Sequence, residues 1–226
     1  TAVGLCHSDM PAFLGSSAIG VAEDGSFYKE TDLTYPLQVG HEPVGVVEAI
    51  GKDVEGFQEG DLVSGLISPC FASHVIVKPE MVKLVKLPPQ VKELKYCLAE
   101  PLMCISNIVR AGTPVFGEYV AVIGCGMMGL LTLSGLARSA AFEIIAIDLL
   151  DSRLEWARRL GATKTINASC EGVPARVGEI TAGHGVDVAV EITGKMVGFT
   201  LVCDIIRGGG DIGGNGRGKI LIPSLY

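Results

Sequence analysis

The sequence predicts an α/β protein in which a β-rich first part is followed by a part with a parallel sheet. Up to about residue 100, short runs rich in Val and Ile are bounded by Gly or Pro, which is typical of a small, irregular β-barrel. After Thr113, strand-like and helix-like runs alternate, which indicates right-handed βαβ crossovers. The composition agrees, because 30 glycines and 6% aromatic residues in 226 residues favour many tight turns around a packed core.

In the first part, three Val- and Ile-rich runs are predicted to be strands: residues 41–51, 60–67 and 73–79. The stretch from Met10 to Val39 contains Gly, Ser, Asp and aromatic residues without a clear period. It is predicted to be a loop, and loops of this length often carry function.

The second part follows helical stretches that surround Pro101 and end at Gly112. The texture changes near residues 111–116, which predicts two domains, 1–112 and 113–226. Five alternating elements are then predicted: a strand at 118–124, a helix at 127–140, a strand at 143–148, a helix at 152–162 and a strand at 187–194.

Charge and cysteine usage exclude several classes of protein. The net charge of −7 gives no basic footprint, which argues against nucleic acid and against an anionic membrane surface as partners. The seven cysteines include no C-x-x-C pair, so neither a zinc ribbon nor a thioredoxin-like motif is present. Scattered cysteines of this kind predict a reducing, cytoplasmic location.

One uncharged run, residues 119–137, has the length of a membrane span. Glycines at positions 124, 126 and 129 interrupt this run. A buried strand, a glycine turn and a buried helix give the same hydropathy, and the glycine spacing favours that interpretation.

The run "GCGMMG" at 124–129 has the G-x-G-x-x-G spacing. Alone this spacing is weak, but here it follows a predicted strand, opens a predicted helix, and precedes Asp148 by 19 residues, counted from Gly129. Gly124 would permit the tight turn, Gly126 the approach of backbone to a pyrophosphate, and Gly129 close packing of helix and strand. The helix N-terminus would then meet the phosphate, so a dinucleotide site is predicted.

Asp148 ends the next predicted strand and favours NAD over NADP. A carboxylate at this place accepts hydrogen bonds from the ribose hydroxyls and repels a 2′-phosphate. Arg153 follows five residues later and is expected to face the adenine or solvent. The alternative is that Asp148 only caps the helix that begins near Ser152.

Residues of the types that bind metals recur at three places in the first part. They are Cys6 in "GLCHSD", His41 and Glu42 in "GHE", and Glu100 with Cys104 in "AEPLMC". A catalytic zinc takes about three ligands from Cys, His and carboxylate and keeps one position open. A single buried cysteine or turn histidine is usually structural. The combination, upstream of a dinucleotide motif, favours a zinc site.

Together these motifs resemble the zinc-containing medium-chain dehydrogenase/reductase superfamily, in its sorbitol, butanediol and polyol dehydrogenase branch. The resemblance covers essentially the whole chain, in the family's order, through "GLCHSD", "VGHEPVGVVEAIGKDVEGFQEGD", "AEPLMC", "VAVIGCGMMGLL" and "GVDVAVEITG". It implies a GroES-like β-barrel catalytic domain followed by a Rossmann domain with a doubly wound parallel sheet, with NAD and zinc as cofactors.

The resemblance also implies the ligands of the zinc ion. Cys6 and His41 match family ligands, and Glu42 matches a glutamate that binds zinc in some members and supports the ligands in others. Glu100 matches a carboxylate at or near the metal in polyol-type members, whereas Cys104 matches a cysteine ligand of tetrameric alcohol dehydrogenases. The two are four residues apart and share a helix face, so the third ligand is ambiguous, with Glu100 favoured.

Three residues beside Cys6 match catalytic positions of the family. Ser8 would relay the substrate proton, His7 would contact the cofactor phosphate or accept the proton, and Asp9 would orient His41, because a carboxylate on a metal-bound histidine fixes its tautomer. Residues beside the dinucleotide motif are expected to contact the cofactor as well. They are Met127, Met128, Thr193 and Gly194.

Two departures from the family are visible. The run "SGLISPCFASH" (64–74) stands where many relatives insert a four-cysteine lobe, which predicts one catalytic zinc and no structural zinc. Family members also extend further at both ends, so the chain is expected to be truncated at both ends. The segment 208–218 is richer in glycine than is usual there.

The sequence therefore predicts a zinc- and NAD-dependent oxidoreductase that interconverts a secondary alcohol or polyol with its ketone, as a homodimer or homotetramer. Two alternatives stay open. One is a zinc-independent quinone or enoyl reductase, which would prefer NADPH. The other is a dinucleotide-binding protein without catalysis. The predicted partner is a small alcohol or polyol, with neither nucleic acid nor membrane involved.

Overall fold

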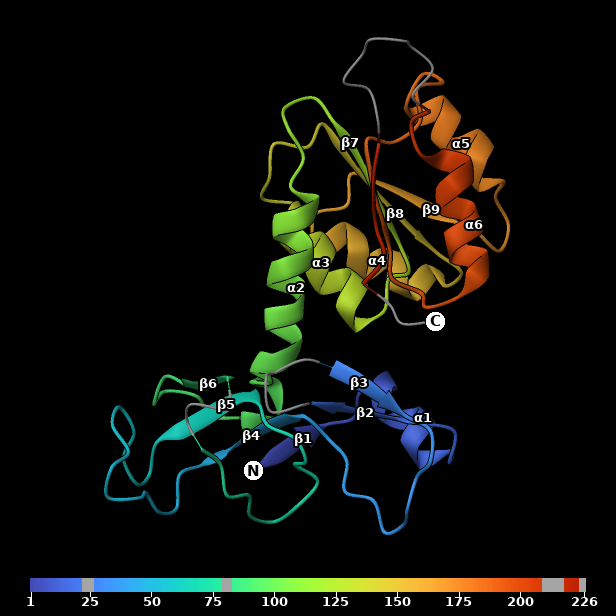
Figure 1. Cartoon of the computed structure of the whole chain (residues 1–226). Helices are drawn as coiled ribbons and strands as arrows, with labels where there is room; N and C mark the ends of the chain where they lie inside the picture. Colours follow the sequence, from blue (N-terminus) through green and yellow to red (C-terminus); the bar gives the residue numbers. More distant parts are fainter. Residues whose placement is uncertain (22–26, 79–82, 209–217, 224–226) are drawn as a thin grey trace. The chain divides into compact units, whose positions relative to one another are not determined.

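The computed structural model describes residues 1–21, 27–78, 83–208 and 218–223. The chain divides into two compact units, Thr1–Met103 and Cys104–Tyr226 (Figure 1). The division falls within helix α2 (Ala99–Gly112), whereas the sequence-based domain limits, which stay a prediction, meet at the end of that helix.

The first unit is built on a four-stranded antiparallel sheet with the strand order β1-β4-β5-β6. Val44 of β4 and Val63 of β5 are buried, as is Cys70, which follows β5. A one-turn helix η3 (Leu94–Tyr96) precedes α2. The strands are β1 (Ala2–Gly4), β4 (Glu42–Val46), β5 (Leu62–Leu66) and β6 (Lys83–Lys86).

The strand predictions at 41–51 and 60–67 are confirmed by β4 and β5, which lie inside those ranges. The strand predicted at 73–79 is wrong for its described residues, 73–78, which have no strand assignment. Val75 is 39% and Ile76 100% exposed, because this run has no neighbouring strand among the described residues. A Val- and Ile-rich run becomes a strand only where a partner completes its hydrogen bonds.

The prediction of one long loop over 10–39 is also wrong for much of its described part. This stretch contains helix α1 (Met10–Phe13) and an antiparallel pair, β2 (Ala18–Val21) with β3 (Phe27–Glu30). Pro11 stands in the first turn of α1, where a missing N–H is tolerated. The Tyr35 hydroxyl donates to the carbonyl of Ala12 at 2.5 Å and so ties the end of the stretch to this helix.

The second unit contains a five-stranded parallel sheet with the strand order β11-β10-β7-β8-β9. The chain order along the sheet reverses beside β7, the arrangement of a doubly wound sheet. The strands are β7 (Tyr119–Ile123), β8 (Glu143–Asp148), β9 (Lys164–Asn167), β10 (Val188–Glu191) and β11 (Lys219–Leu221).

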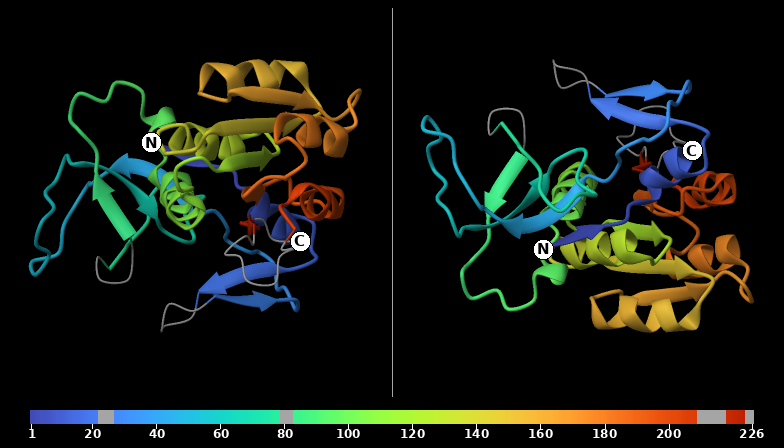
Figure 2. Two further views of the ribbon diagram at one scale, coloured as in Figure 1. Left: turned by 90° about the horizontal axis from the view of Figure 1, so that it is seen from above. Right: turned by 90° about the horizontal axis from the view of Figure 1, so that it is seen from below.

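Helices cover both faces of this sheet (Figure 2). Residues of α3 (Met127–Leu136) and α4 (Asp151–Arg159) share one buried cluster with Ile108 of α2. Residues of α5 (Val173–Ile180) and α6 (Met196–Ile205) belong to a second cluster on the other face. Because both faces are buried, the strands are almost continuously apolar, as parallel sheets require.

The alternating strands and helices predicted after Thr113 are therefore confirmed, and the uncharged run at 119–137 is β7, a glycine turn and α3. Four elements of the second unit, β9, α5, α6 and β11, were not predicted from the sequence. Most of the glycine-rich segment 208–218 lies outside the described residues. In the part of the chain that the structure describes, no helix combines the length and apolarity needed to cross a bilayer.

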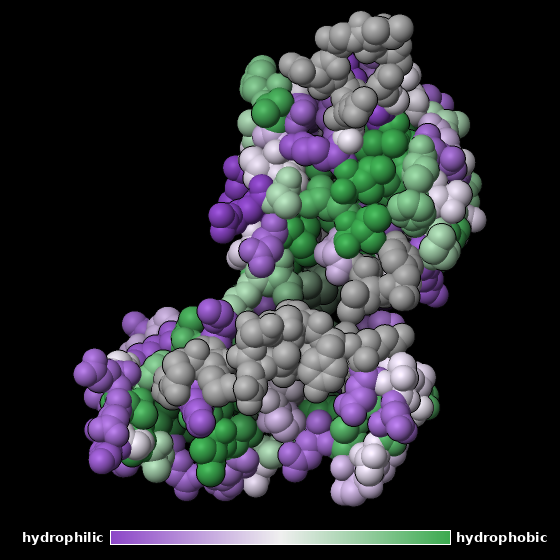
Figure 3. All heavy atoms as spheres, in the orientation of Figure 1, coloured by the Kyte–Doolittle hydropathy of each residue, from purple (hydrophilic) through white to green (hydrophobic). Residues whose placement is uncertain are grey.

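Apolar side chains gather on one face of the second unit, over the region of β11 and α6 (Figure 3). Exposed members on or beside these elements include Met196, Val197, Ile220 and Ile222. Strand β11 is at the edge of the described sheet. Such edges are usually covered by further strands or by a partner.

Replacing Thr132 by valine is expected to stabilise the protein. Thr132 of α3 is fully buried, and its hydroxyl has no hydrogen-bond partner among the described residues. A valine keeps the shape and removes the desolvated hydroxyl, so the free energy of unfolding should rise by about 1 kcal/mol. Urea denaturation measures this change. Thr200→Val is the matched control, because the Thr200 hydroxyl already donates to the carbonyl of Met196, and that variant should gain nothing.

Candidate functional site

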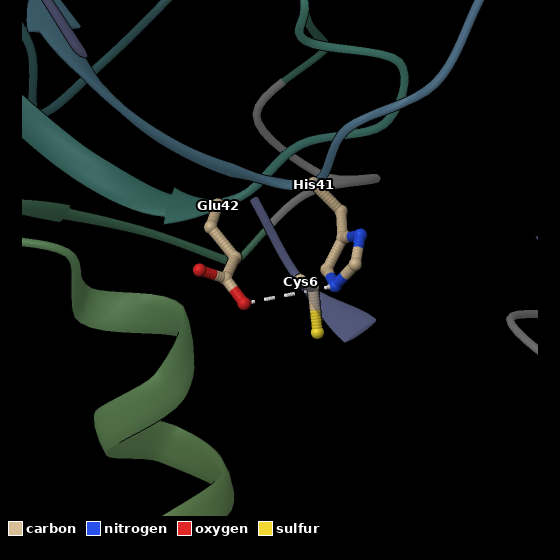
Figure 4. Close-up of side chains that lie close together, drawn as sticks. All are labelled: Cys6, His41 and Glu42. Atoms are coloured by element: carbon tan, nitrogen blue, oxygen red, sulfur yellow. Dashed lines mark ion pairs between the residues drawn. The ribbon is translucent and has the colours of Figure 1, made fainter. Parts of the chain in front are cut away.

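Three of the predicted metal ligands lie together in the first unit. One ligand atom each of Cys6, His41 and Glu42 lies within 4.8 Å of the others. Nε2 of His41 is 4.0 Å from Oε1 of Glu42, and the Cys6 thiol lies beside both side chains (Figure 4). The group combines a sulfur, a nitrogen and an oxygen ligand, which is a donor set suited to zinc.

The pairing of β1 with β4 brings these residues together. Gly4 pairs with Glu42 in the antiparallel register, and Cys6 follows Gly4 by two residues. A side chain on Gly4 would overlap Oε2 of Glu42, so the glycine leaves the space that the carboxylate occupies. Glu42 is therefore 5% exposed yet still reaches the group.

Asp9 connects the two segments that carry the candidate ligands. Its Oδ2 accepts the backbone N–H of Cys6 at 3.0 Å, and its Oδ1 accepts the backbone N–H of Gly40 at 3.3 Å. The same Oδ1 lies 3.3 Å from Nδ1 of His41. The prediction that Asp9 orients His41 therefore has the required geometry, because Nδ1 faces the carboxylate and Nε2 faces Glu42.

The electrostatics of the group favour a cation. The pKa of His41 is raised to about 9, first by its hydrogen bond to Cys6, against the effect of burial, and further by the charges of Cys6, Asp9 and Glu100. The pKa of Glu42 is raised mainly by burial, while its hydrogen bond with Cys6 lowers it and the charge of Glu100 raises it. The negative charge around His41 stabilises a proton on its ring, and it would stabilise a bound metal cation for the same reason.

The residues present fit a zinc ion. Ligands in a tetrahedral zinc site stand about 3.5 Å apart, since each lies about 2.0–2.3 Å from the metal. The group of Cys6, His41 and Glu42 is only slightly wider than that. Small side-chain rotations would close it around an ion and leave a fourth position for another ligand.

The other two candidate ligands stand on α2. Glu100 is partly buried and acts electrostatically on both His41 and Glu42, although it does not belong to the compact group of three. Cys104 is exposed and begins the second compact unit. Glu100 as the third ligand and Cys104 as its alternative both stay predictions.

The predicted proton relay stands on a one-turn helix, η1 (His7–Asp9), directly after Cys6. Ser8 is partly buried and His7 is exposed. Both are therefore next to the candidate metal centre in the chain, and Asp9, the last residue of η1, is turned into it.

The glycine motif of the second unit has the geometry of a dinucleotide loop. Gly124 has φ +98°, a left-handed conformation that favours glycine. A side chain on Gly129 would overlap the carbonyl oxygen of Gly124, so α3 packs closely on the end of β7. Gly126 is the N-cap of α3, and a Cβ on it would meet nothing within 4 Å. The free N–H groups of α3 therefore begin beside open space.

Asp148 ends β8 beside this loop. Its Oδ2 accepts the backbone N–H of Cys125 at 2.7 Å, and its Oδ1 accepts that of Leu150 at 3.0 Å. Arg153 approaches Oδ2 at 3.5 Å, so the arginine faces the carboxylate rather than only adenine or solvent. Capping a helix is therefore not the full role of Asp148, because this residue also holds the glycine loop through the N–H of Cys125.

The remaining predicted cofactor residues border the same loop. Met127 is 57% exposed, and Met128 is partly buried in the first turn of α3. Thr193 and Gly194 follow β10, and Gly194 has φ +66°. A Cβ on Gly124 would lie 2.9 Å from Cγ2 of Thr193, so the turn after β10 forms a wall of the glycine loop.

Two cysteine thiols near these sites are buried, and burial raises the pKa of each. Burial raises the pKa of Cys125 to about 12, and the charge of Asp148 adds to this. Burial likewise raises the pKa of Cys70 to about 11. A thiol with such a pKa stays protonated at neutral pH and is a poor nucleophile.

Sequence reasoning missed two residues that shape the sites. Gly4 makes room for Glu42, but its role depends on strand register and leaves no local signal. Glu191 is fully buried at the end of β10. A charged residue that ends the apolar run "DVAVE" was a visible signal for it.

The fold and the two sites define a dehydrogenase-type architecture, a β unit with a candidate metal centre and a doubly wound unit with a dinucleotide loop. Comparison with known proteins agrees. Residues 1–89 match the family model "Alcohol dehydrogenase GroES-like domain", and residues 128–222 match "Zinc-binding dehydrogenase". The chain belongs to the zinc-containing medium-chain dehydrogenase/reductase superfamily.

Individual relatives are similar over most of this chain. (R,R)-butanediol dehydrogenase of Bacillus subtilis is 32% identical over 221 residues, which is 86% of this chain and 62% of that protein. Erythritol/L-threitol dehydrogenase of Mycolicibacterium smegmatis is 28% identical, over 91% of this chain and 65% of that protein. The chain thus spans somewhat less than two thirds of these curated relatives.

A solved structure supports the same fold. The crystal structure of 2R,3R-butanediol dehydrogenase from Bacillus subtilis has a TM-score of 0.72 and 26% identity, and the match covers 99% of this chain and 68% of that one. The predicted fold class, a GroES-like domain and a Rossmann-type parallel sheet, is therefore confirmed.

Proposed function

We propose that the protein is a zinc-dependent oxidoreductase that transfers a hydride between a secondary alcohol or polyol and NAD. The observation that carries the proposal is the group of Cys6, His41 and Glu42 in a unit of the alcohol dehydrogenase type. The dinucleotide loop and Asp148 support NAD as the second reactant. Names of similar proteins, which include butanediol and erythritol/L-threitol dehydrogenases, support the substrate class.

In this proposal Cys6, His41 and Glu42 would hold the zinc ion. Glu42 replaces Glu100, which the sequence favoured as third ligand, because Glu42 lies in the compact group. Bound zinc would polarise the substrate oxygen and lower the pKa of the alcohol, and bound NAD would accept the hydride. Asp9 keeps Nδ1 of His41 fixed, so that Nε2 is free to be a ligand. Its bond to the N–H of Cys6 also holds the thiol-bearing segment in place.

The chain's own residues would remove the substrate proton. Oγ of Ser8 accepts the hydroxyl proton of the alcohol and donates its own toward the imidazole of His7. Both residues are on η1, next in sequence to the candidate ligand Cys6. His7 is exposed, so a proton on its ring can pass to water.

The proposal also covers the location, assembly, zinc content and partners of the protein. We place the protein in the cytoplasm, as a homodimer or homotetramer with one catalytic zinc and no structural zinc per chain. We propose neither nucleic acid nor membrane as a partner. The zinc-independent quinone or enoyl reductase type is disfavoured, because an enzyme of that type needs no metal-ligand group such as Cys6, His41 and Glu42.

A screen of NAD reduction with diols, polyols and simple secondary alcohols tests the proposal. The zinc-loaded chain should retain about one zinc per chain and turn over at least one class of these alcohols. Dipicolinate, which removes zinc, should abolish turnover, and added zinc should restore it. Retention of no zinc, or turnover that is unchanged by dipicolinate, would overturn it. NAD binding without any turnover would support the non-catalytic alternative.

A further inference from the structure

Glu191, at the carboxyl end of β10, is fully buried. Its Oε1 accepts the backbone N–H of Thr193 at 2.8 Å and also a short hydrogen bond from the Thr193 hydroxyl. Burial of a carboxylate costs free energy, which such hydrogen bonds offset only in part. Both of these bonds come from Thr193, in the short turn formed by residues 192–195.

This turn is held at both of its ends. The N–H of Ile192 donates to the carbonyl of Ile123 at 3.0 Å, which continues the pairing of β10 with β7. The Thr193 hydroxyl oxygen accepts the N–H of Lys195 at 3.1 Å, just before α6 begins. Glu191 therefore fixes the conformation of the turn through Thr193.

The turn touches the glycine loop directly. A Cβ on Gly124 would lie 3.2 Å from the backbone nitrogen of Thr193. A Cβ on Gly129 would lie 3.1 Å from Cγ2 of Ile192. Two glycines of the dinucleotide motif thus pack on the segment that Glu191 fixes, so a displacement of this segment would act on the loop from the side of β10, opposite to Asp148.

Gly198, in the first turn of α6, leaves the space for the carboxylate. A Cβ on Gly198 would overlap Oε1 of Glu191 and would lie 2.5 Å from the Thr193 hydroxyl oxygen. The helix can therefore cross above Glu191 only with glycine at this position. The arrangement offers a way to disturb the carboxylate without touching the glycine loop.

The turn lies on one side of the point where the strand order reverses. Dinucleotides bind across that crevice, with one half on each side. Asp148 ends β8 on the side where the adenosine ribose is expected, and β10 is on the opposite side of β7. The turn after β10 consequently faces the half of the crevice that receives the nicotinamide.

We propose that Glu191 is a positioning residue for the nicotinamide half of the cofactor, because it holds turn 192–195 as a rigid wall of the glycine loop. The inference rests on the proposed function, since it assumes that NAD is the ligand. It assigns a role to a buried carboxylate that has no part in metal binding or proton transfer.

The test compares Gly198→Ala with Gly178→Ala, using calorimetric titration with NAD and with AMP. Gly198→Ala should weaken NAD binding about tenfold or more through displacement of the turn, with AMP binding changed less than about twofold. Gly178, inside α5, is the matched control, because a Cβ there meets nothing within 4 Å. Gly178→Ala should bind both ligands like the wild type.

A second variant covers the case in which Gly198→Ala does not fold. Glu191→Gln keeps the side-chain shape but makes a weaker, neutral acceptor, so it should weaken NAD binding by a smaller factor, again without loss of AMP binding. Two outcomes would overturn the inference while the proposed function stands. One is an equal loss of NAD and AMP binding. The other is that Gly198→Ala and Glu191→Gln both bind the ligands as Gly178→Ala does. A wild-type chain that binds no NAD would overturn both.

Discussion

Replacing Gly126 by alanine is expected to weaken NAD binding by about 100-fold while the protein remains as stable as the wild type. Gly126 has φ −72°, which any L-residue adopts, and a Cβ there meets nothing within 4 Å. The change in the free energy of unfolding should therefore be less than about 1 kcal/mol. The open space lies at the N-terminus of α3, where a phosphate would approach the free N–H groups, and a methyl group would occupy it.

Gly129→Ala is the matched comparison, and its main expected effect is a loss of stability. Its Cβ would overlap the carbonyl oxygen of Gly124, so the helix and the end of β7 must separate. We expect a loss of about 3 kcal/mol in the free energy of unfolding, measured by urea denaturation. If Gly126→Ala loses stability as Gly129→Ala does, or if it binds NAD normally, the assignment of this loop to a dinucleotide is wrong.

The dinucleotide loop could be predicted from the sequence because all of its requirements are local. A strand, a glycine turn and a helix follow one another within about 20 residues. Each glycine meets a requirement of the local backbone, and the spacing of the glycines is enough to predict it. Asp148 was identifiable by its distance along the chain. Its bond to the N–H of Cys125 was not, since that bond depends on how β8 lies beside β7.

The candidate metal centre was predictable only in part. Residue types and the family resemblance identified Cys6, His41 and Glu42, which are distant in the sequence. Their meeting depends on the β1–β4 register, which pairs Gly4 with Glu42 and which no spacing rule supplies. The failed strand at 73–79 has the same origin, because strand formation depends on a partner elsewhere in the chain.

Replacing Cys6 by serine is expected to remove zinc from the protein. The thiolate is the strongest of the three candidate ligands for zinc, and a serine hydroxyl is not a usual ligand. Affinity should fall by more than about 100-fold, beyond the usual loss for residues that only support a ligand. Zinc content after dialysis against a competing chelator measures this. Cys203→Ser, at an exposed cysteine of α6, is the control and should keep its zinc.

The same measurement of zinc content can distinguish the roles of Glu42 and Glu100. Glu42 belongs to the compact group, whereas Glu100 acts on it electrostatically, so Glu42→Gln should lose zinc nearly as Cys6→Ser does, and Glu100→Gln should lose about tenfold in affinity. Thermal unfolding gives an independent reading, because a ligand at about 1,000 times its Kd stabilises the folded state by about 4 kcal/mol. The wild type should gain this stabilisation and Glu42→Gln should not. The reverse order, with Glu100→Gln losing zinc and Glu42→Gln retaining it, would make Glu100 the third ligand and Glu42 its support.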